Sequence, residues 1–473
     1  MVVLKTNIDD PLLREIGRVA DTTSTVVYVV GGYIRDRMLG KEAKDVDVVV
    51  LGDGVAFAKT MASVWKAPNP VVFERFGTAM IELEKHKIEF VSARKESYNK
   101  ESRKPAVDRG SLSDDLARRD FTVNAIAASL NNASFGAIED PFDGQGDLKR
   151  KILKTPLEPE KTFDDDPLRI LRAVRFAAQL SFAIDPGVFS AGRKMRERLR
   201  IVSQERITDE LLKIMATKKP SVGLQAAYDM GLLGIIFPEV ESLAGVEQRQ
   251  EYHHKDVLRH TLMVVDNISE GTEDVWLRIA GLLHDIAKPK TKAFKEGTGW
   301  TFHGHEELGA RMVKPIFRRL RLPLEHVPYV EKLVRLHLRP MALVDSEVTD
   351  SAVRRLMFDA GPEVDDLMAL CRADITSKNP RLVEQVRKNY ELVILKMKEV
   401  EEKDRIRNWQ PPLRGEEIMQ LCDLVPGKLV GILKDRITEA ILDGIIPNEH
   451  GAAKEYLLRI KDDTIRNHVD KST

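Results

Sequence analysis

The sequence predicts an α+β protein, in which a head of strands and helices precedes a long all-α body. Two β-branched runs, STVVYVV over 24–30 and KDVDVVVL over 44–51, favour strands near the start of the chain. Beyond about residue 155 the apolar residues instead recur at every third or fourth position, which is typical of amphipathic helices.

Local patterns predict the elements of the head in order. We expect a strand over 24–30, a helix over 33–39, a strand over 44–51, and a hairpin formed by 78–84 and 87–94. Pro105 and Gly110 lie in a polar stretch, so 95–110 is predicted to be a mobile loop. Capping residues followed by helical spacing predict a helix over 111–130.

Changes of pattern divide the chain into four predicted parts. They are a head over 1–155, a helical neck and body over 156–245, a second helical domain over 246–398 and a helical tail over 399–473. The charged stretch 399–412 is predicted to be a linker, and Pro426-Gly427 is predicted to separate two tail helices. We expect this tail to be a packing module or a contact surface for RNA.

Composition limits the classes of function. The chain has 473 residues with 74 Lys plus Arg and 74 Asp plus Glu, so any nucleic-acid surface must be a local basic patch. Cys371 and Cys422 form no CxxC unit, which argues against a disulfide framework or a zinc knuckle. No run approaches the ~20 apolar residues of a membrane helix. We therefore expect a cytoplasmic protein with no membrane partner.

Gly31-Gly32 and Arg35 form the first candidate binding element. The glycines lie between a predicted strand and a predicted helix, where exposed backbone N–H groups suit a triphosphate. Arg35 falls in the first turn of that helix and would add a charged contact. Taken alone, the pair of glycines more often marks a plain tight turn than a phosphate site.

Asp45 and Asp47 form the second element. Alternate residues of a strand point to the same face, so two carboxylates would lie side by side within an apolar run. A pair of Mg²⁺ ions would relieve their repulsion and could activate a 3′-hydroxyl while holding a triphosphate. The alternative is a strand end with two solvated acids. Glu89 on the neighbouring strand is a candidate third carboxylate.

Arginine-rich segments supply two further candidates. Arg118 and Arg119 could bind sugar or phosphate and be held in place by Asp120, unless they lie on a solvated helical face. Downstream, Pro167 suits the first turn of a helix and Asp166 suits its N-cap.

From Asp166 the arginines Arg169, Arg172 and Arg175 follow at every third position, as a surface stripe or a ligand-binding one. Cytosine and adenine present a donor and an acceptor on the pairing edge in the same order, whereas guanine and uracil present the reverse. An Asp acceptor beside an Arg donor therefore accepts C and A and rejects G and U.

These segments together resemble a known family. VVGGYIRDRMLG, KDVDVVV, LARRDFTVNAIA and DDDPLRILRAVRFAAQL are similar to the motifs of class II tRNA nucleotidyltransferases and bacterial poly(A) polymerases, and they occur in the family's order. The resemblance implies a polymerase-beta-like nucleotidyltransferase head, consisting of a small mixed sheet with helices, and a helical neck, body and tail. It also implies that Gly32 and Arg35 contact the nucleotide, that Asp45 and Asp47 hold magnesium, and that Arg119 contacts the sugar or triphosphate.

The resemblance also assigns the helical segment. It implies that Asp166 and Arg169 read the base, while Arg172 and Arg175 hold phosphates or the helix itself. The segment 95–118 resembles the loop with which family members switch from C to A, and this favours template-independent CCA addition to tRNA from CTP and ATP. Residues 161–206 hold ten Lys and Arg against six Asp and Glu, a local excess suited to a tRNA acceptor stem.

A second site is predicted in the C-terminal half. His260, His284, Asp285 and Asp374 resemble the H…HD…D pattern of the HD superfamily of metal-dependent phosphohydrolases. Other histidines lie nearby in the sequence: His303, His305 and His337. Such ligands suit a transition metal such as Mn²⁺, Ni²⁺ or Fe, which could activate water for phosphoester hydrolysis. The alternative is a helical domain with hydrogen-bonded core histidines.

Three other functions compete with CCA addition. The first is a poly(A) polymerase or an enzyme that adds only A. The second makes the HD domain the working phosphohydrolase and the head a nucleotide sensor. The third is a non-catalytic RNA-binding scaffold, which leaves the two acids on one strand face unexplained.

Overall fold

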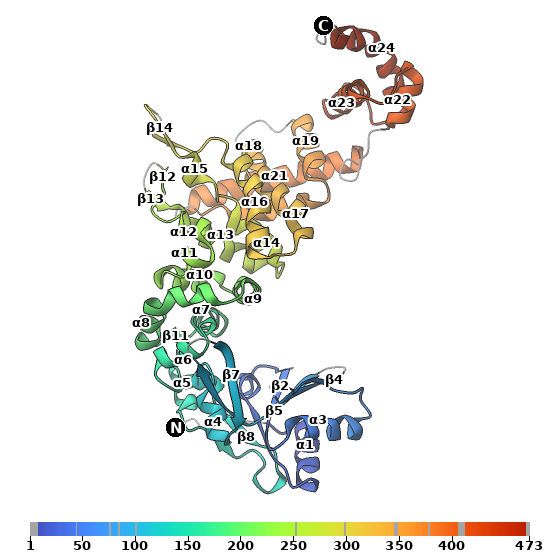
Figure 1. The fold of residues 1–473 in the computed structure, drawn as a ribbon. Helices are drawn as coiled ribbons and strands as arrows, with labels where there is room; N and C mark the ends of the chain where they lie inside the picture. The colour runs from blue at the N-terminus through green and yellow to red at the C-terminus, as the bar shows by residue number, and fades with distance from the viewer. Residues whose placement is uncertain are drawn as a thin grey trace. The chain divides into compact units, whose positions relative to one another are not determined.

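The computed structural model of the protein contains two compact units, Met1–Phe237 and Pro238–Thr473 (Figure 1). The structure describes residues 8–43, 45–74, 77–83, 86–99, 102–250, 253–297, 299–344, 349–376, 379–404 and 412–469. None of the helices in these ranges is long and apolar enough to cross a lipid bilayer.

A mixed β-sheet forms the centre of the first unit, in the strand order β3–β4–β5–β2–β1–β8–β9. Its strands are β1 (Val26–Val30), β2 (Asp45–Leu51), β3 (Val71–Phe73), β4 (Thr78–Leu83), β5 (His86–Ser92), β8 (Ala127–Ser129) and β9 (Ile138–Glu139). β2 runs antiparallel to β1 and parallel to β5. The two predicted β-branched strands are confirmed, as is the antiparallel pairing of β4 with β5.

Helices pack against this sheet through apolar side chains. α1 (Pro11–Thr22) contacts β1, and α3 (Gly54–Trp65) contacts β2, β4 and β5. Asp10 and Asp53 cap these two helices by accepting backbone N–H bonds in the first turn. α2 (Gly32–Met38) follows β1 directly and confirms the helix predicted over 33–39.

The helix predicted over 111–130 is wrong beyond its first turns. α4 (Leu112–Ala117) begins with a capping box between Ser111 and Asp114, but the chain then forms a 3₁₀ turn and the strand β8. The carboxylate of Asp120 accepts bonds from the backbone N–H of Phe121 and the amide of Asn124, which competes with helical hydrogen bonding. Pairing of β8 with β1 fixes the remainder as a strand.

The loop predicted over 95–110 is also wrong in its backbone. β6 (Arg94–Asn99) and β7 (Ser102–Arg109) form an antiparallel two-stranded ladder with an irregularity between Ser97 and Asn99. A two-stranded ribbon can pair its own backbone groups without burying an apolar face. The alternation that marks a half-buried strand is therefore missing from this part of the sequence.

The rest of the first unit is helical apart from a short parallel pair, β10 (Ile152–Leu153) with β11 (Ala183–Ile184). The helices are α5 (Gly144–Arg150), α6 (Pro159–Asp165), α7 (Leu168–Leu180), α8 (Pro186–Met195), α9 (Gln204–Met215), α10 (Pro220–Asp229) and α11 (Leu233–Ile236). α7 contacts α6, α9 and α10, and its apolar residues are buried among them. Pro167 occupies its N-cap position, one residue later than predicted, although Asp166 still accepts a bond from the N–H of Leu168.

The second unit is almost wholly helical, as predicted. Its helices before the tail are α12 (Pro238–Glu241), α13 (Val257–Gly271), α14 (Val275–Leu283), α15 (Lys288–Thr291), α16 (His305–Leu320), α17 (Val327–Leu336), α18 (Arg339–Val344), α19 (Asp350–Ala360), α20 (Val364–Ala373) and α21 (Pro380–Asp404). Two hairpins accompany them, formed by β12 (Glu247–Gln250) with β13 (His253–Asp256) and by β14 (Ala293–Lys295) with β15 (Gly299–Thr301).

The tail forms its own small apolar core. α22 (Gly415–Cys422), α23 (Lys428–Leu442) and α24 (His450–Val469) bury Ile418, Leu433 and Leu457 together. Pro426-Gly427 separates α22 from α23, as predicted. The linker predicted over 399–412 begins instead as the last turns of α21, because the charged residues 399–404 continue its helical spacing. Residues 405–411 of that linker lie outside the described residues.

Candidate active site

A left-handed glycine opens the site at the junction of β1 and α2. Gly31 has φ of 72°, and a Cβ atom added to it would lie 2.7 Å from Nη1 of Arg119. This position therefore requires glycine both for its backbone conformation and for the close approach of the arginine. Gly32, the first residue of α2, lines the cavity that follows this turn.

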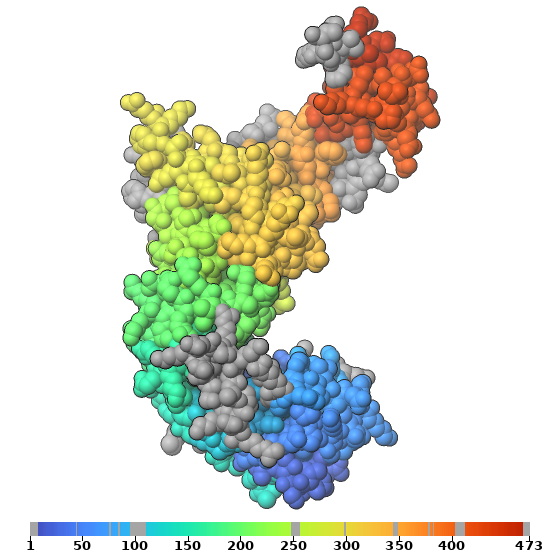
Figure 2. All heavy atoms as spheres, in the orientation of Figure 1, coloured from blue at the N-terminus to red at the C-terminus, as the bar shows by residue number. Residues whose placement is uncertain are grey.

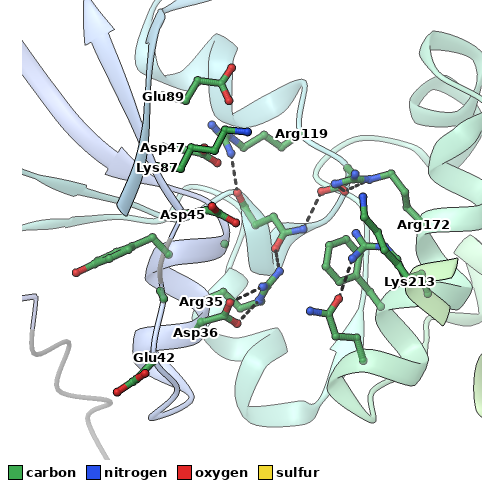
Figure 3. Close-up of a pocket in the computed structure, with 18 residues that line it drawn as sticks. Arg35, Asp36, Glu42, Asp45, Asp47, Lys87, Glu89, Arg119, Arg172 and Lys213 are labelled. Carbon is green, nitrogen blue, oxygen red and sulfur yellow. Dashed lines mark hydrogen bonds and ion pairs between the residues drawn. The ribbon is translucent and has the colours of Figure 1, made fainter. Parts of the chain in front are cut away.

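Arg35 of α2 is fixed by its neighbours. Its Nη1 atom donates to Oδ1 of Asn124 at 2.7 Å, while Nε and Nη2 donate to the two carboxylate oxygens of Asp36 at 2.8 Å each. The side chain is buried and also lines the cavity. Its partners thus hold the guanidinium in one orientation (Figure 3).

The carboxylates of Asp45, Asp47 and Glu89 lie on one face of the sheet. Asp45 and Asp47 alternate with buried valines along β2, and Glu89 is the register partner of Asp47 on β5. Burial raises the pKa of Asp47, and the charge of Asp45 adds to this increase while Arg119 opposes it. Burial and the charge of Asp47 likewise raise the pKa of Glu89. This set of hard oxygen donors fits a divalent cation such as Mg²⁺, which would favour the ionised forms.

Arg118 and Arg119 are held by Asp115, which corrects the predicted role of Asp120. The fully buried Asp115 accepts from Nε of Arg118 at 3.0 Å and from Nη2 of Arg119 at 3.2 Å. Burial raises the pKa of Asp115, but the charges of Arg119 and Arg118 outweigh this effect and the pKa is lowered. Spacings of three and four residues on α4 were the available signal for these pairs.

Asp120 instead reaches α7. Its Oδ2 atom accepts from Nη2 of Arg172 at 2.6 Å. Burial alone would raise the pKa of Asp120, but the charge of Arg172 and the amide of Asn124 lower it to about 2. Arg175 pairs with the buried Glu210 of α9, and its guanidinium lies 3.8 Å from the ring centre of Phe176. Glu210 was not predicted from the sequence, because it lies more than thirty residues from both Arg172 and Arg175.

These groups line a cavity of about 690 Å³, within the usual range for small-molecule sites. Asp45, Asp47 and Glu89 contribute acidic groups from the sheet, as Figure 3 shows. The basic groups that line it are Arg35, Lys87, Arg119, Arg172, Arg175 and Lys213. The arrangement is therefore suited to a polyanion that is bridged to the acids by cations.

Asp166 and Arg169 lie beside this cavity rather than among its lining residues. Nη2 of Arg169 donates to the carbonyl oxygen of Arg118 at 2.6 Å, next to the cavity-lining Arg119. Oδ2 of Asp166 is 2.7 Å from Nη2 of Arg206 on α9. The structure therefore brings the predicted catalytic acids and arginines together, and it places the predicted base-reading pair next to them.

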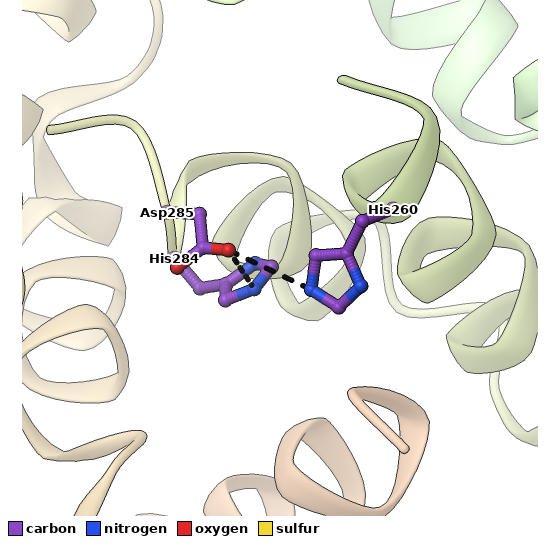
Figure 4. A group of neighbouring side chains, drawn as sticks. All are labelled: His260, His284 and Asp285. Carbon is purple, nitrogen blue, oxygen red and sulfur yellow. Dashed lines mark ion pairs between the residues drawn. The ribbon is translucent and has the colours of Figure 1, made fainter. Parts of the chain in front are cut away.

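A buried cluster of histidines and aspartates forms a second site in the other unit. Asp374 Oδ1 lies 2.9 Å from Nε2 of His260, and Asp285 Oδ2 lies 3.2 Å from Nε2 of His284. Figure 4 shows His260, His284 and Asp285 converging from two helical segments. The four residues predicted from the HD pattern are thus brought together.

Two of the neighbouring histidines join this cluster and one does not. Nε2 of His305 lies 3.3 Å from Oδ1 of Asp285, and Nε2 of His337 lies 4.0 Å from the same oxygen. Asp285 is therefore common to two potential metal-binding groups, one with His260 and His284 and one with these two histidines. His303 is exposed and belongs to neither group.

The hydrogen bonding of the histidines leaves their inward nitrogens for a metal. Nδ1 of His284, His305 and His337 each lies 2.7 Å from a main-chain carbonyl oxygen. Within the part of the chain that the structure describes, the buried Nε2 atoms of His284 and His305 have no hydrogen-bond partner. Anchoring at Nδ1 with an open Nε2 is the arrangement expected of metal ligands, so these residues fit a transition-metal ion.

Charges and burial shift the pKa values of the residues in this cluster in different directions. Burial lowers the pKa of His284, but the charges of Asp285 and Asp374 outweigh it and raise that pKa to about 10. Burial and the charge of His284 lower the pKa of His337 to about 4. The neighbouring histidines hold the pKa of Asp374 below its usual range despite its burial. The cluster is therefore negatively charged at its aspartates, as a cation site requires.

Comparison with known proteins identifies three domains along the chain. Residues 27–154 match the poly(A) polymerase head domain, residues 181–243 match the probable RNA- and SrmB-binding site of polymerase A, and residues 257–378 match the HD domain. The fold and the site thus define a nucleotidyltransferase head joined to an HD domain.

Relatives specify the family further. The chain is 34% identical over 338 residues to an A-adding tRNA nucleotidyltransferase of Deinococcus radiodurans, covering 70% of this chain and 75% of that protein. It is 36% identical over 307 residues to a multifunctional CCA protein of Dechloromonas aromatica, covering 63% and 70%. The chain therefore belongs to the tRNA nucleotidyltransferase family and is an enzyme of this class.

Solved structures share the fold. A CCA-adding enzyme in its apo form I has a TM-score of 0.64 and 22% identity, covering 97% of this chain and 95% of that one. The Thermotoga maritima CCA-adding enzyme in complex with tRNA has a TM-score of 0.61 and 22% identity, covering 96% and 97%. The predicted α+β class, with a nucleotidyltransferase head and an all-α remainder, is confirmed.

Proposed function

We propose that the protein adds C, C and A to the 3′ end of tRNA, using CTP and ATP without a nucleic acid template. The observation that carries this proposal is the cavity in which Asp45 and Asp47 face a set of arginines. Acids and bases that line one cavity suit a triphosphate that is bound through Mg²⁺ by the acids and directly by the bases. Membership of the tRNA nucleotidyltransferase family supports this choice of substrate.

Asp45 and Asp47 would hold Mg²⁺, with Glu89 beside them as a further oxygen donor. When bound, Mg²⁺ would supply Lewis acidity for the attack of a 3′-hydroxyl on the α-phosphate and positive charge beside the leaving pyrophosphate. Residues of this chain would make the other contacts with the nucleotide. Gly32 and Arg35 would contact the nucleotide from α2, and Arg119 would contact its sugar or triphosphate.

α7 would combine phosphate binding with base choice. Arg172 and Arg175 reach the cavity and would bind phosphates, while their acidic partners keep α7 against the rest of the site. Asp166 would accept from the amino group of C or A, and Arg169 would donate to its ring nitrogen. In the structure Asp166 already accepts from a donor, the guanidinium of Arg206, and Arg169 already donates to an acceptor, the carbonyl oxygen of Arg118.

The histidine–aspartate cluster supports a second candidate activity, the metal-dependent hydrolysis of phosphoesters at RNA ends. The observation that supports this activity is that Nε2 atoms without hydrogen-bond partners lie around the carboxylate of Asp285. His260, His284, Asp285 and Asp374 would hold a transition metal such as Mn²⁺, Ni²⁺ or Fe. When bound, that ion would lower the pKa of a water molecule. A head that only senses nucleotides is not favoured, since acids and arginines share one cavity.

The nucleotide-addition assay tests the main proposal. Purified protein with Mg²⁺, CTP and ATP is incubated with tRNA lacking CCA and, separately, with tRNA ending in CC. Addition of C, C and A to the first tRNA, followed by arrest, is expected. Extension of only the CC-ended tRNA would make the protein A-adding, and long A tails on arbitrary RNA would make it a poly(A) polymerase.

A further inference from the structure

The hairpin of β14 and β15 combines exposed aromatic rings with lysines. Phe294 and Trp300 are register partners across the two strands, and their side chains are 64% and 40% exposed. Their ring centres lie 5.3 Å apart in an edge-to-face arrangement. Isolated exposed apolar residues are ordinary on proteins, but two paired rings on a short ribbon form an exposed aromatic surface.

Lysines surround these rings. Nζ of Lys292 lies 4.3 Å from the ring centre of Trp300. Lys290 and Lys295 are exposed, and no carboxylate of the described residues lies within ion-pair distance of Lys290, Lys292 or Lys295. The surface therefore offers both aromatic rings and a local excess of positive charge, with Glu296 as the acid next to Lys295, although the chain as a whole has equal numbers of acidic and basic residues.

The hairpin is connected at both ends to the histidine–aspartate cluster. The short helix α15 connects Asp285 to β14, and His305 lies a few residues after β15. Lys288 of α15 lies 2.7 Å from Asp285 through Nζ, while Nδ1 of His305 bonds to the carbonyl oxygen of Phe302. Figures 1 and 2 show the hairpin extending from the helices of its unit, in agreement with the exposure of its two rings.

We propose that this hairpin is a binding surface for single-stranded RNA leading to the histidine–aspartate cluster. Bases would stack on Trp300 and Phe294, and Lys290, Lys292 and Lys295 would bind the adjoining phosphates. Single-stranded RNA fits better than a protein partner, because unpaired bases offer flat faces and phosphates offer charges at short intervals, and this hairpin places rings and lysines close together. The proposal does not depend on nucleotide addition by the head.

Binding of a short, fluorescently labelled single-stranded RNA to the full-length protein tests this surface. Trp300→Ala is expected to weaken binding by about tenfold, the usual effect of losing one stacked base, whereas Trp300→Phe should retain most of the affinity. The double change of Lys290 and Lys295 to Gln should lower the slope of log affinity against log salt by about 1.4. Lys314→Gln changes an exposed lysine of α16 and serves as the matched control.

Crosslinking and catalysis make the outcome decisive. RNA containing 4-thiouridine should crosslink to residues of β14 or β15 in the unaltered protein and lose that crosslink in Trp300→Ala. All variants should keep the melting temperature and the nucleotide addition of the unaltered protein, which shows that they fold. Unchanged affinity in Trp300→Ala, equal losses in Lys314→Gln, or crosslinks confined to the first unit would each overturn the proposal.

Discussion

Arg172 donates through both Nε and Nη2 to a single carboxylate oxygen of Asp120, at 2.8 and 2.6 Å. This pair joins the segment after α4 to α7, so the two stretches that carry the arginines of the cavity are fixed to each other. Asp120 is buried, and its remaining bonds go to Phe121 and Asn124. The pair is consequently a structural support of the site as well as part of its wall.

Removal of Arg172 should loosen α7. Arg172→Ala leaves the carboxylates of Asp120 and Glu210 buried with one cation fewer, which should destabilise the region by roughly 3 kcal/mol. Hydrogen exchange of the α7 amides measures this loss locally. Arg200→Ala, which removes an exposed pair with Glu197, is the control and should change stability by less than about 1 kcal/mol. Equal protection of α7 in both variants would contradict the prediction.

The contribution of the Asp120–Arg172 pair to the free energy of unfolding should depend on pH. Because the pKa of Asp120 is lowered from 3.8 to about 2, its contribution to stability is complete above pH 3.8. That contribution is lost as the pH falls through about 2. In Arg172→Ala, burial without the arginine should raise the pKa of Asp120. The variant should therefore lose the unpaired buried charge by protonation at a higher pH than the unaltered protein does. The difference in unfolding free energy between the two proteins, measured by denaturant titration, should shrink as the pH is lowered from 7 towards 4. A constant difference would contradict a stabilising role for the Asp120–Arg172 pair.

Loss of one carboxylate on β2 should separate catalysis from binding. Asp47→Ala is expected to abolish nucleotide addition, because the Mg²⁺ site loses a ligand, while affinity for tRNA measured by filter binding survives. Glu82→Gln, at an exposed acid of strand β4 in the same sheet, should leave addition unchanged. Normal addition by Asp47→Ala would refute the assignment.

Arg169 should determine which base is added. Arg169→Ala removes one of two groups that read the pairing edge, so selection of C and A over G and U should fall by roughly 10- to 100-fold. The measurement is kcat/KM for all four nucleotides. Arg198→Ala, which removes an exposed pair with Asp164, should not alter selection. An equal fall with every nucleotide would show that Arg169 serves only to hold the fold.

Metal binding by the second unit should depend on His284. After chelation and dialysis, the protein should bind Mn²⁺ or Ni²⁺ in a calorimetric titration, and His284→Ala should lose most of that heat. His303→Ala removes an exposed histidine outside the cluster and should bind as before. Retention of the metal by His284→Ala would point to a different set of ligands.

Short-range patterns explain which features were predictable. The strand alternation placed Asp45 and Asp47 on one face, and the HD spacing identified four residues that the fold brings together. The helix over 111–130 failed because β8 is fixed by pairing with the distant β1. The partner of Arg119 was misassigned for a similar reason. Asp115 and Asp120 are both close to Arg119 in sequence. Asp120 pairs with Arg172 of α7 instead, so the position of α7 leaves Asp115 as the partner of Arg119.

The crowding at Gly31 ties the turn after β1 to the arginine opposite. Any side chain introduced there would displace the guanidinium of Arg119, even if the backbone tolerated its left-handed conformation. A substitution at position 31 therefore has to be combined with one at position 119, because a side chain at position 31 would occupy the space that the guanidinium fills.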